Sequence, residues 1–288
     1  MGAIHCYVCN GSEFTEREGI VRDAPDLRIQ ECTLCGFVFL QPLDDRGEQF
    51  YADSGMHERD VAIEEWLRET SVDDERRLKA LLPKIVNRNV LDVGCGAGGF
   101  LNAAMLYAKE ATGVEPESRL APHFQELGLR VHSSINALPA HSYDLITLFH
   151  VLEHVPDPRA MLTELSSLLS DRGEIIVEVP SSSDALLSIY KSDAFSRFTY
   201  WSCHLNLFDQ HTLKKLATQA GLRVNFVTQL QRYPLSNHLH WLATGGPGGH
   251  KTWSQIDSPE LDAAYAASLA RMGACDTIFA SLSRMQED

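Results

Sequence analysis

Residues 90–99 are an apolar run that leads into a glycine-rich turn, Val90-Leu91-Asp92-Val93-Gly94-Cys95-Gly96-Ala97-Gly98-Gly99. The pattern predicts a buried strand, a tight turn and then a helix. Glycine allows such a turn and lets the backbone approach a ligand without a Cβ atom in the way. Glu115 ends the next expected strand, where a carboxylate can accept hydrogen bonds from both hydroxyls of a ribose. The stretch therefore predicts a nucleoside-binding loop in an α/β fold.

The chain around this loop alternates between strand and helix patterns. Expected strands cover 89–93, 111–115, 129–132, 143–149 and 174–179, and expected helices cover 98–108, 117–127 and 158–169. Asp157 and Pro158 form a good cap and first position for the third helix, and Gly173 is expected just past its end. A helix near 209–220 and a strand near 222–230 continue the pattern. Alternation of this kind predicts a parallel sheet with helices on both faces.

Changes of pattern divide the chain into four segments. A cysteine-rich module covers 1–42, a linker and helical cap 43–88, the α/β domain 89–234, and a loop and helix 235–288. Two helices are expected in the cap, at about 59–70 and 72–82. Ser71 and Asp74 resemble a capping box at the start of the second helix, and Pro83 is expected to end it. Residues 235–257 are expected to be irregular. The last helix opens at Ser258-Pro259.

The glycine loop fits two kinds of ligand. Gly94, Gly96 and Gly99 also satisfy the G-x-G-x-x-G pattern of dinucleotide-binding enzymes. Asp92, two residues before the first glycine, would repel a pyrophosphate and suits a ligand that carries sulfonium and ammonium charges. This favours S-adenosylmethionine over a nicotinamide cofactor. In the alternative interpretation Asp92 only caps a turn.

Several segments resemble the motifs of class I S-adenosylmethionine-dependent methyltransferases. Leu91–Gly98 looks like their first motif and Gly113–Pro116 their second. Tyr143–Ile146 followed by His150–Val155 resembles the fourth, and Gly173–Pro180 the fifth-strand motif. The resemblance covers about residues 88–230 and implies a Rossmann-like sheet that binds S-adenosylmethionine.

The resemblance also implies which residues hold the cofactor. Asp92 and the loop with Gly94, Cys95, Gly96 and Gly98 would hold the methionine portion, and Glu115 the ribose. The third motif departs from the family, because Ser133-Ser134-Ile135-Asn136 stands where an acidic residue often contacts the adenine. We expect Asn136 or a backbone amide to serve there, and Phe149 to be a further cofactor contact.

Four of the seven cysteines form two pairs, Cys6-x-x-Cys9 and Cys32-x-x-Cys35, with 22 residues between them. Two such knuckles predict a tetrahedral Zn²⁺ site, and four thiolates leave no open position, so the ion is expected to be structural. Iron–sulfur and redox roles are disfavoured, since there is no helix-start dithiol and no third close cysteine. In architecture a zinc ribbon before such a domain is similar to bacterial methyltransferases that act on sugars. The alternative is a module that docks a protein partner.

Methyl transfer to a hydroxyl, or to a carbon beside a carbonyl, needs a base, and histidine or glutamate is the usual choice. The candidates are His150, Glu153 and His154, which follow the fourth strand, and His204. In the alternative interpretation His150 and Glu153 pack or cap beneath the cofactor and His154 bonds the backbone of a turn. Tyr200 and Trp201 are expected either to line the acceptor pocket or to lie in the core.

The chain has 25 Lys+Arg and 39 Asp+Glu, a formal charge of −14, which disfavours nucleic acid and anionic lipid as partners of the whole molecule. No apolar stretch reaches the length of about 18 residues that a membrane helix needs. An odd number of cysteines and a start without signal-peptide features predict a reducing compartment, the cytoplasm.

The sequence thus predicts transfer of a methyl group from S-adenosylmethionine to a small polar acceptor, with a histidine base. The acceptor is expected to be a sugar, a sugar nucleotide or a surface-polysaccharide unit. The alternatives are O-methylation of a quinone-like or natural-product phenol, an NAD-dependent oxidoreductase, and a non-catalytic adaptor that docks through the zinc ribbon.

Overall fold

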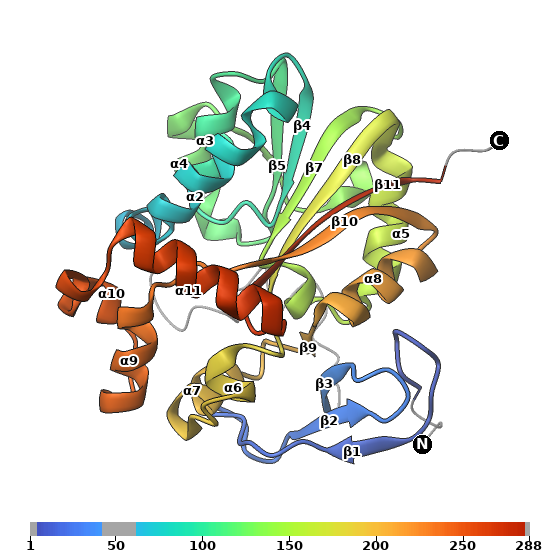
Figure 1. The fold of residues 1–288 in the computed structure, drawn as a ribbon. Coiled ribbons are helices and arrows are strands. Elements are labelled where there is room, and N and C mark those ends of the chain that lie inside the picture. Colours follow the sequence, from blue (N-terminus) through green and yellow to red (C-terminus); the bar gives the residue numbers. More distant parts are fainter. Residues whose placement is uncertain (1–4, 42–61, 286–288) are drawn as a thin grey trace.

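The computed structural model describes residues 5–41 and 62–285, which form two sheets (Figure 1). The larger has seven strands in the order β10-β11-β8-β7-β4-β5-β6. Its parallel part consists of β4 (Asn89–Val93), β5 (Glu110–Val114), β6 (Arg130–His132), β7 (Tyr143–Phe149) and β8 (Leu169–Pro180). Two antiparallel strands, β10 (Leu222–Leu230) and β11 (Thr277–Arg284), complete one edge.

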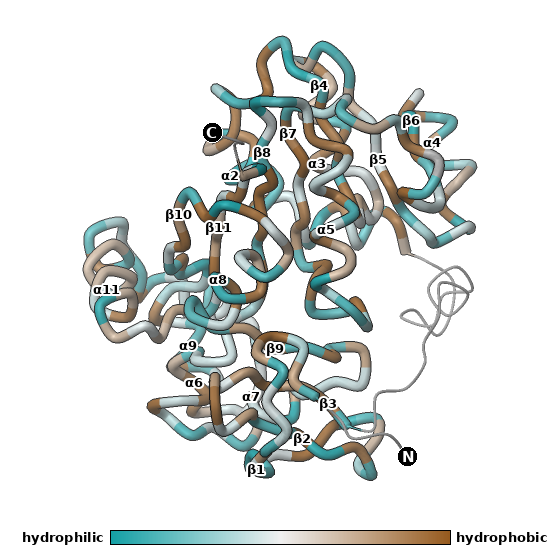
Figure 2. The backbone as a smooth tube through the Cα atoms, turned by 90° about the vertical axis from the view of Figure 1, so that its right-hand side faces the viewer, coloured by the Kyte–Doolittle hydropathy of each residue, from teal (hydrophilic) through white to brown (hydrophobic). Residues whose placement is uncertain are grey.

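Helices cover both faces of this sheet (Figure 1). On one side lie α2 (Ile63–Ile85), α3 (Gly99–Met105) and α4 (Ala121–Leu127), and on the other α5 (Pro158–Leu168) and α8 (Gln210–Gln219). The central strands are hydrophobic along most of their length (Figure 2), and β7 is almost wholly buried. A strand covered on both faces must be apolar on both. The predicted Rossmann-like α/β fold is confirmed.

The expected pair of helices before the sheet is one helix, α2, so the predicted capping box is wrong. Ser71 lies inside the helix and its hydroxyl donates to the Arg68 carbonyl, while Asp74 accepts from Thr70. Pro83 does not end the helix but lies in its last turn. The helix continues to Ile85, whose side chain is buried in the core. Positions 59–61 of the expected first helix lie outside the described residues.

The helix α5 is capped as predicted, since the Asp157 side chain accepts from the Ala160 N–H at 2.9 Å. Its end differs from the prediction. Gly173 is not past a helix terminus but inside β8, which begins at Leu169 directly after the helix. A Cβ atom at Gly173 would lie 2.7 Å from the Tyr143 carbonyl oxygen, so the close approach of β7 and β8 requires glycine there.

The C-terminal segment contains more structure than the loop and helix that we expected. It forms α9 (Leu235–Thr244), α10 (Gly249–Thr252) and α11 (Pro259–Met272), and the chain then inserts β11 between β8 and β10. The expectation of an irregular 235–257 is therefore wrong. Residues 277–284 belong to the sheet of the α/β domain and not to the C-terminal segment. With this change, the division into four segments remains a proposal.

The N-terminal module is a small antiparallel sheet of β1 (Phe14–Glu16), β2 (Arg28–Cys32) and β3 (Val38–Gln41). Its fourth strand, β9 (Asn206–Leu207), comes from the segment that precedes α8. The Asp23 carboxylate also accepts bonds from the backbone N–H and hydroxyl of Ser202. The module is thus joined to the larger α/β part by backbone pairing and by side chains. Among the described helices, none has the length and apolar character needed to cross a bilayer.

Candidate active site

The glycine loop between β4 and α3 has the conformation that the sequence predicts. Gly94, Gly96 and Gly98 have φ values of +69°, +53° and +82°, a region that favours glycine. A Cβ atom at Gly94 would lie 2.5 Å from a methyl carbon of Val151, and one at Gly96 2.7 Å from the Trp66 ring. The loop is therefore a backbone cradle at the carboxyl end of β4, where open α/β sheets bind ligands.

The N-terminal half of α2 lies over this cradle. Trp66 faces Gly96, and the Asp74 carboxylate lies against Gly99. Sequence reasoning missed both residues. The helical pattern of residues 63–85 shows that a helix exists, but only the tertiary structure shows which of its residues meet the loop.

Asp92 is the charged group nearest the start of the loop. It is only 2% exposed and accepts a hydrogen bond of 2.7 Å from the Thr147 hydroxyl. Burial raises the pKa of Asp92 to about 7. A cationic ligand beside this carboxyl group would favour its ionised form. The arrangement fits the sulfonium donor predicted from the sequence better than a diphosphate.

Glu115 directly follows β5 and links the end of this strand to the glycine loop. Its carboxylate accepts from the Gly96 N–H at 2.9 Å and from the Glu117 N–H at 3.0 Å, and burial raises its pKa. Cys95 is buried beneath Gly113, and burial raises the pKa of its thiol. The structure thus brings Asp92, Cys95 and Glu115 to one end of the sheet.

The two remaining cofactor candidates lie differently. Phe149, at the end of β7, packs edge-on against Phe100, and the Arg77 guanidinium lies 4.4 Å from its ring centre. Asn136 is exposed in the short helix η2 (Ile135–Ala137). Direct contact of either residue with the cofactor remains a prediction.

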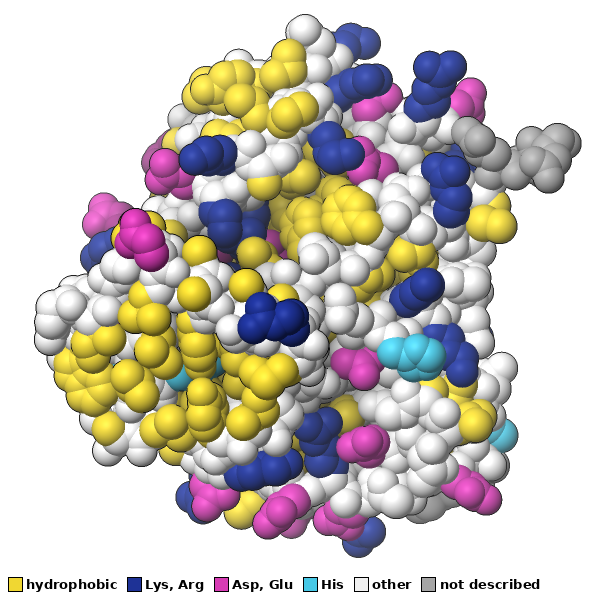
Figure 3. All heavy atoms as spheres, in the orientation of Figure 1, with side chains coloured by type: hydrophobic (Ala, Val, Ile, Leu, Met, Phe, Trp, Pro, Cys, Tyr) yellow, Lys and Arg dark blue, Asp and Glu magenta, His cyan; other side chains and the backbone are white. Residues whose placement is uncertain are grey.

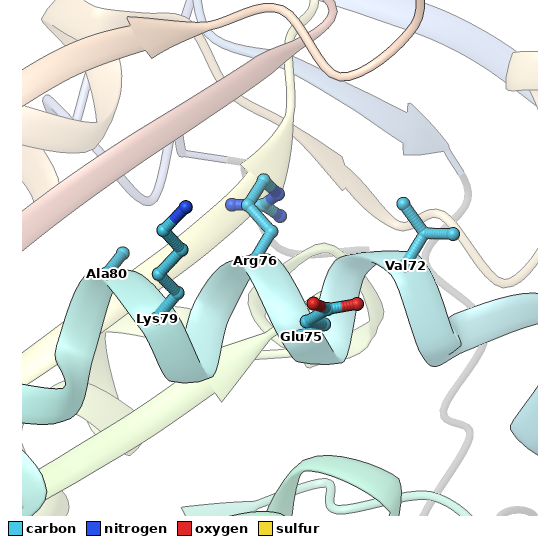
Figure 4. A pocket seen from close by; sticks show the side chains of 5 residues that line it. All are labelled: Val72, Glu75, Arg76, Lys79 and Ala80. Carbon is cyan, nitrogen blue, oxygen red and sulfur yellow. The ribbon is translucent and has the colours of Figure 1, made fainter.

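A hollow of about 620 Å³ lies along α2, lined by Val72, Glu75, Arg76, Lys79 and Ala80 (Figure 4). No residue of the glycine loop lines it. It is therefore separate from the nucleoside cradle.

A network of charged groups joins α2 to the strands. Glu178 on β8 is fully buried and pairs with Arg77 at 2.7 Å and with Arg76 at 2.9 Å. Burial alone would raise the pKa of Glu178, but His150 and Arg77 hold it well below its usual range. Arg232, which follows β10, pairs with Asp73 of the same helix.

His150 belongs to this network. Its Nδ1 lies 3.2 Å from a Glu153 oxygen, and its Nε2 lies 2.9 Å from the Arg232 guanidinium and 3.5 Å from a Glu178 oxygen. Burial and Arg232 lower the pKa of His150, but the bonds to Glu153 and Glu178 outweigh them and the pKa is raised. Both ring nitrogens thus have polar protein partners. This arrangement favours the alternative in which His150 packs beneath the cofactor site.

The other three candidates form a compact cluster, which we call the His-Glu cluster: Glu153, His154 and His204. One ligand atom of each lies within 4.8 Å of the others. Glu153 and His154 belong to the turn η3 (Leu152–His154) after β7, and His204 precedes β9. Burial lowers the pKa of both histidines, that of His204 to about 4. Both are therefore neutral at pH 7.

The two aromatic candidates, Tyr200 and Trp201, lie in different surroundings. Tyr200 is 2% exposed and lies in the hydrophobic core of the N-terminal module, which favours the alternative of a core residue. The Trp201 ring lies edge-on to the rings of His154 and His204, with centroids 6.0 and 5.5 Å away. Trp201 therefore borders the His-Glu cluster.

The four predicted zinc ligands meet in the N-terminal module. The sulfurs of Cys6 and Cys35 are 3.6 Å apart, and those of Cys9 and Cys32 are 3.4 Å apart. All four lie within 4.8 Å of one another, and none forms a disulfide. Sulfurs that each lie about 2.3 Å from a tetrahedral ion are separated by about 3.8 Å, so the cluster is compatible with a zinc ribbon.

Comparison with known proteins shows the family of this chain. A family model described as "Methyltransferase domain" matches residues 63–225, more than half of the chain. The chain belongs to this methyltransferase family. The match spans the glycine loop, Glu115 and the His-Glu cluster.

Two relatives are named ubiquinone biosynthesis O-methyltransferase. The one from Citrobacter koseri is 29% identical over 170 residues, covering 50% of this chain and 69% of its own. The one from Coxiella burnetii is 26% identical over 176 residues, covering 56% and 75%. No other activity is named in these two relatives.

Two solved structures share the fold. A SAM-dependent methyltransferase from Archaeoglobus fulgidus has a TM-score of 0.52 at 19% identity and covers 74% of this chain and 94% of its own. A structure of the Haloferax volcanii Trm112 methyltransferase activator with a methyltransferase gives 0.52 at 13% identity, covering 79% and 100%. Fold, family and site together define an S-adenosylmethionine-dependent methyltransferase.

Proposed function

We propose that this methyltransferase transfers the methyl group to the oxygen of a phenol or quinol-like small molecule. The observation that carries this choice is the activity for which the relatives are named, O-methylation in ubiquinone biosynthesis. The sugar acceptor expected from the sequence rested on the architecture of the N-terminal module, and the relatives give it no support.

The surroundings of the His-Glu cluster support an aromatic acceptor. Trp201 borders the cluster and is partly exposed, with the Arg22 guanidinium 5.0 Å from its ring centre. The helix α7 (Asp193–Thr199) ends beside it, and the Thr199 carbonyl bonds His204. Hydrophobic side chains gather over α7 and α9 (Figure 3), including Phe198 and Leu242, which are 48% and 46% exposed. Such a surface suits an apolar ligand better than a sugar.

The reaction forms a bond between the acceptor oxygen and the methyl carbon while the carbon–sulfur bond breaks, and the acceptor loses its proton. Asp92 and the loop Gly94–Gly98 would hold the methionine portion and Glu115 the ribose hydroxyls. The acceptor proton would pass to the His-Glu cluster. His154 is the better base, because the pKa of His204 falls further.

The four-cysteine cluster would hold one structural Zn²⁺. Its sheet pairs with β9, so its first role would be to support the segment that carries His204. Free thiols are consistent with the reducing cytoplasm expected from the sequence.

The acceptor class can be tested with a panel of catechols, hydroquinones and sugar nucleotides, each incubated with S-adenosylmethionine. Mass measurement of the products should show a gain of one CH₂ unit for the phenols. If the sugar nucleotides were methylated and the phenols were not, the acceptor would be a carbohydrate.

A further inference from the structure

We propose that the His-Glu cluster of Glu153, His154 and His204 is a second metal site, suited to a divalent transition ion such as Zn²⁺ or Mn²⁺. Two imidazoles and one carboxylate are the ligands that such ions prefer. The cluster is separate from the four cysteines, and nothing in the sequence spacing of the three residues suggests it.

The backbone orients both histidines for this role. His154 Nδ1 lies 2.8 Å from the Cys203 carbonyl oxygen, and His204 Nδ1 lies 2.9 Å from that of Thr199. A carbonyl only accepts, so each ring carries its proton on Nδ1 and has its lone pair on Nε2. Metal-binding histidines are commonly fixed in this way by a bond at the other nitrogen.

Glu153 provides the independent sign of a ligand. It is 2% exposed, and its Oε1 lies near His150, but its Oε2 is buried with no hydrogen-bond partner among the described residues. A buried carboxylate oxygen without a partner is costly. A cation between Glu153 and the two imidazoles would satisfy it.

The elements that carry the ligands are tied together. The side-chain amide of Asn206, which is fully buried, donates to the Val155 carbonyl at 2.6 Å and joins β9 to the end of η3. Asp23 holds Ser202, two residues before His204, at 2.6 Å. Ligand atoms that are each about 2 Å from one ion lie within about 4 Å of one another. The ligand atoms of the His-Glu cluster lie within 4.8 Å of one another, so they need to approach by only about 1 Å to bind an ion.

Three protein ligands leave positions open on the ion. If the proposed acceptor is correct, a phenol oxygen would occupy one of them, and the ion would lower the pKa of that hydroxyl. With the ion bound, the histidines would act as ligands, and the proton of the hydroxyl would pass to solvent instead of to the His-Glu cluster. This step rests on the proposed function, whereas metal binding does not.

The test measures zinc in the full chain after reconstitution with excess Zn²⁺ and removal of unbound metal. We expect two ions per chain in the wild type and one in Glu153→Gln and His204→Ala, with binding of the second ion weakened about a hundredfold or more. His211→Ala, an exposed histidine on α8, is the matched control and should keep both.

S-adenosylhomocysteine affinity, unchanged in these variants, shows that they fold. One ion per chain in the wild type, lost only when a cysteine of the N-terminal cluster is replaced, would overturn the second site. Because no acceptor is present in this assay, a failure of the phenol panel does not affect its outcome.

Discussion

At the scale of single residues, the site depends on a carboxyl group whose charge changes near neutral pH. Asp92 was identified from the sequence because it precedes the glycines by two positions, and the structure adds that burial raises its pKa to about 7. The sequence could not show this shift, since it arises from residues packed around β4 in three dimensions.

This shift predicts a pH-dependent affinity for S-adenosylmethionine. Above pH 7 Asp92 is ionised and attracts the cationic donor, and below pH 7 it is neutral. The affinity should therefore fall as the pH is lowered from 8 to 6. Calorimetric titration at several pH values measures this. A flat profile for the wild type would contradict the role of Asp92.

Asp92→Asn preserves the shape of the side chain and removes the charge. We expect the binding free energy of S-adenosylmethionine to weaken by about 1–3 kcal/mol at pH 8, the scale of a lost charge-assisted hydrogen bond. The affinity of this variant should also no longer change between pH 6 and 8. Wild-type affinity in the variant would mean that Asp92 only caps the turn.

Some site residues were within reach of the sequence and others were not. The glycines and Glu115 were recognisable because their chemistry follows the order of strand, turn and helix. Trp66 and Asp74 were missed because their contacts with the loop depend on where α2 packs. His204 was a candidate base in the sequence, but its approach to His154 depends on the pairing of β9 with β3.

At the scale of elements, α2 is fastened to β8 by ion pairs to Glu178 and to Glu174, which lie in different surroundings. Arg77 and Glu178 are 7% and 0% exposed, whereas Lys84 and Glu174 are 40% and 19% exposed. Loss of Glu178 removes the closest carboxylate from the buried Arg77 and leaves it only the more distant Asp74 at 3.3 Å among the described residues, whereas solvent screens the pair of Lys84 and Glu174.

Glu178→Gln should therefore lower the free energy of unfolding by about 3–5 kcal/mol. Glu174→Gln, on the same strand and facing the same helix, should cost less than about 1 kcal/mol. Urea denaturation of both variants provides the measurement. Equal losses would show that the buried network does not hold α2 in place.

Local patterns predicted the parallel strands and their helices because each strand is a short apolar run bounded by turn residues. They failed for α2, where Pro83 suggested an end that core packing overrides. They also failed for β11, because residues 277–284 are a strand only through pairing with β8 and β10. Such pairing is not encoded in local sequence.

At the scale of the whole molecule, the N-terminal module and the methyltransferase domain share a strand. β3 pairs with β9, which leads from the segment with His204 into α8. Disturbing the cysteine cluster should therefore disturb acceptor turnover more than cofactor binding.

Cys35→Ser tests this coupling. We expect loss of zinc from the N-terminal cluster and a fall in acceptor turnover of about tenfold or more, with S-adenosylhomocysteine affinity changed less than about twofold, since supporting residues around metal sites typically contribute on this scale. Cys275→Ser, a buried cysteine outside the cluster, is the control and should retain zinc. Parallel losses of turnover and cofactor affinity would mean that the module supports the whole fold rather than the His204 segment.

The central claim is that the cradle at the end of β4 binds a sulfonium nucleoside. Calorimetric titration of the full chain with S-adenosylhomocysteine and, separately, with NADH tests it most directly. We predict saturable binding of S-adenosylhomocysteine at one site per chain and no heat of binding with NADH. Binding of NADH without binding of S-adenosylhomocysteine would contradict it.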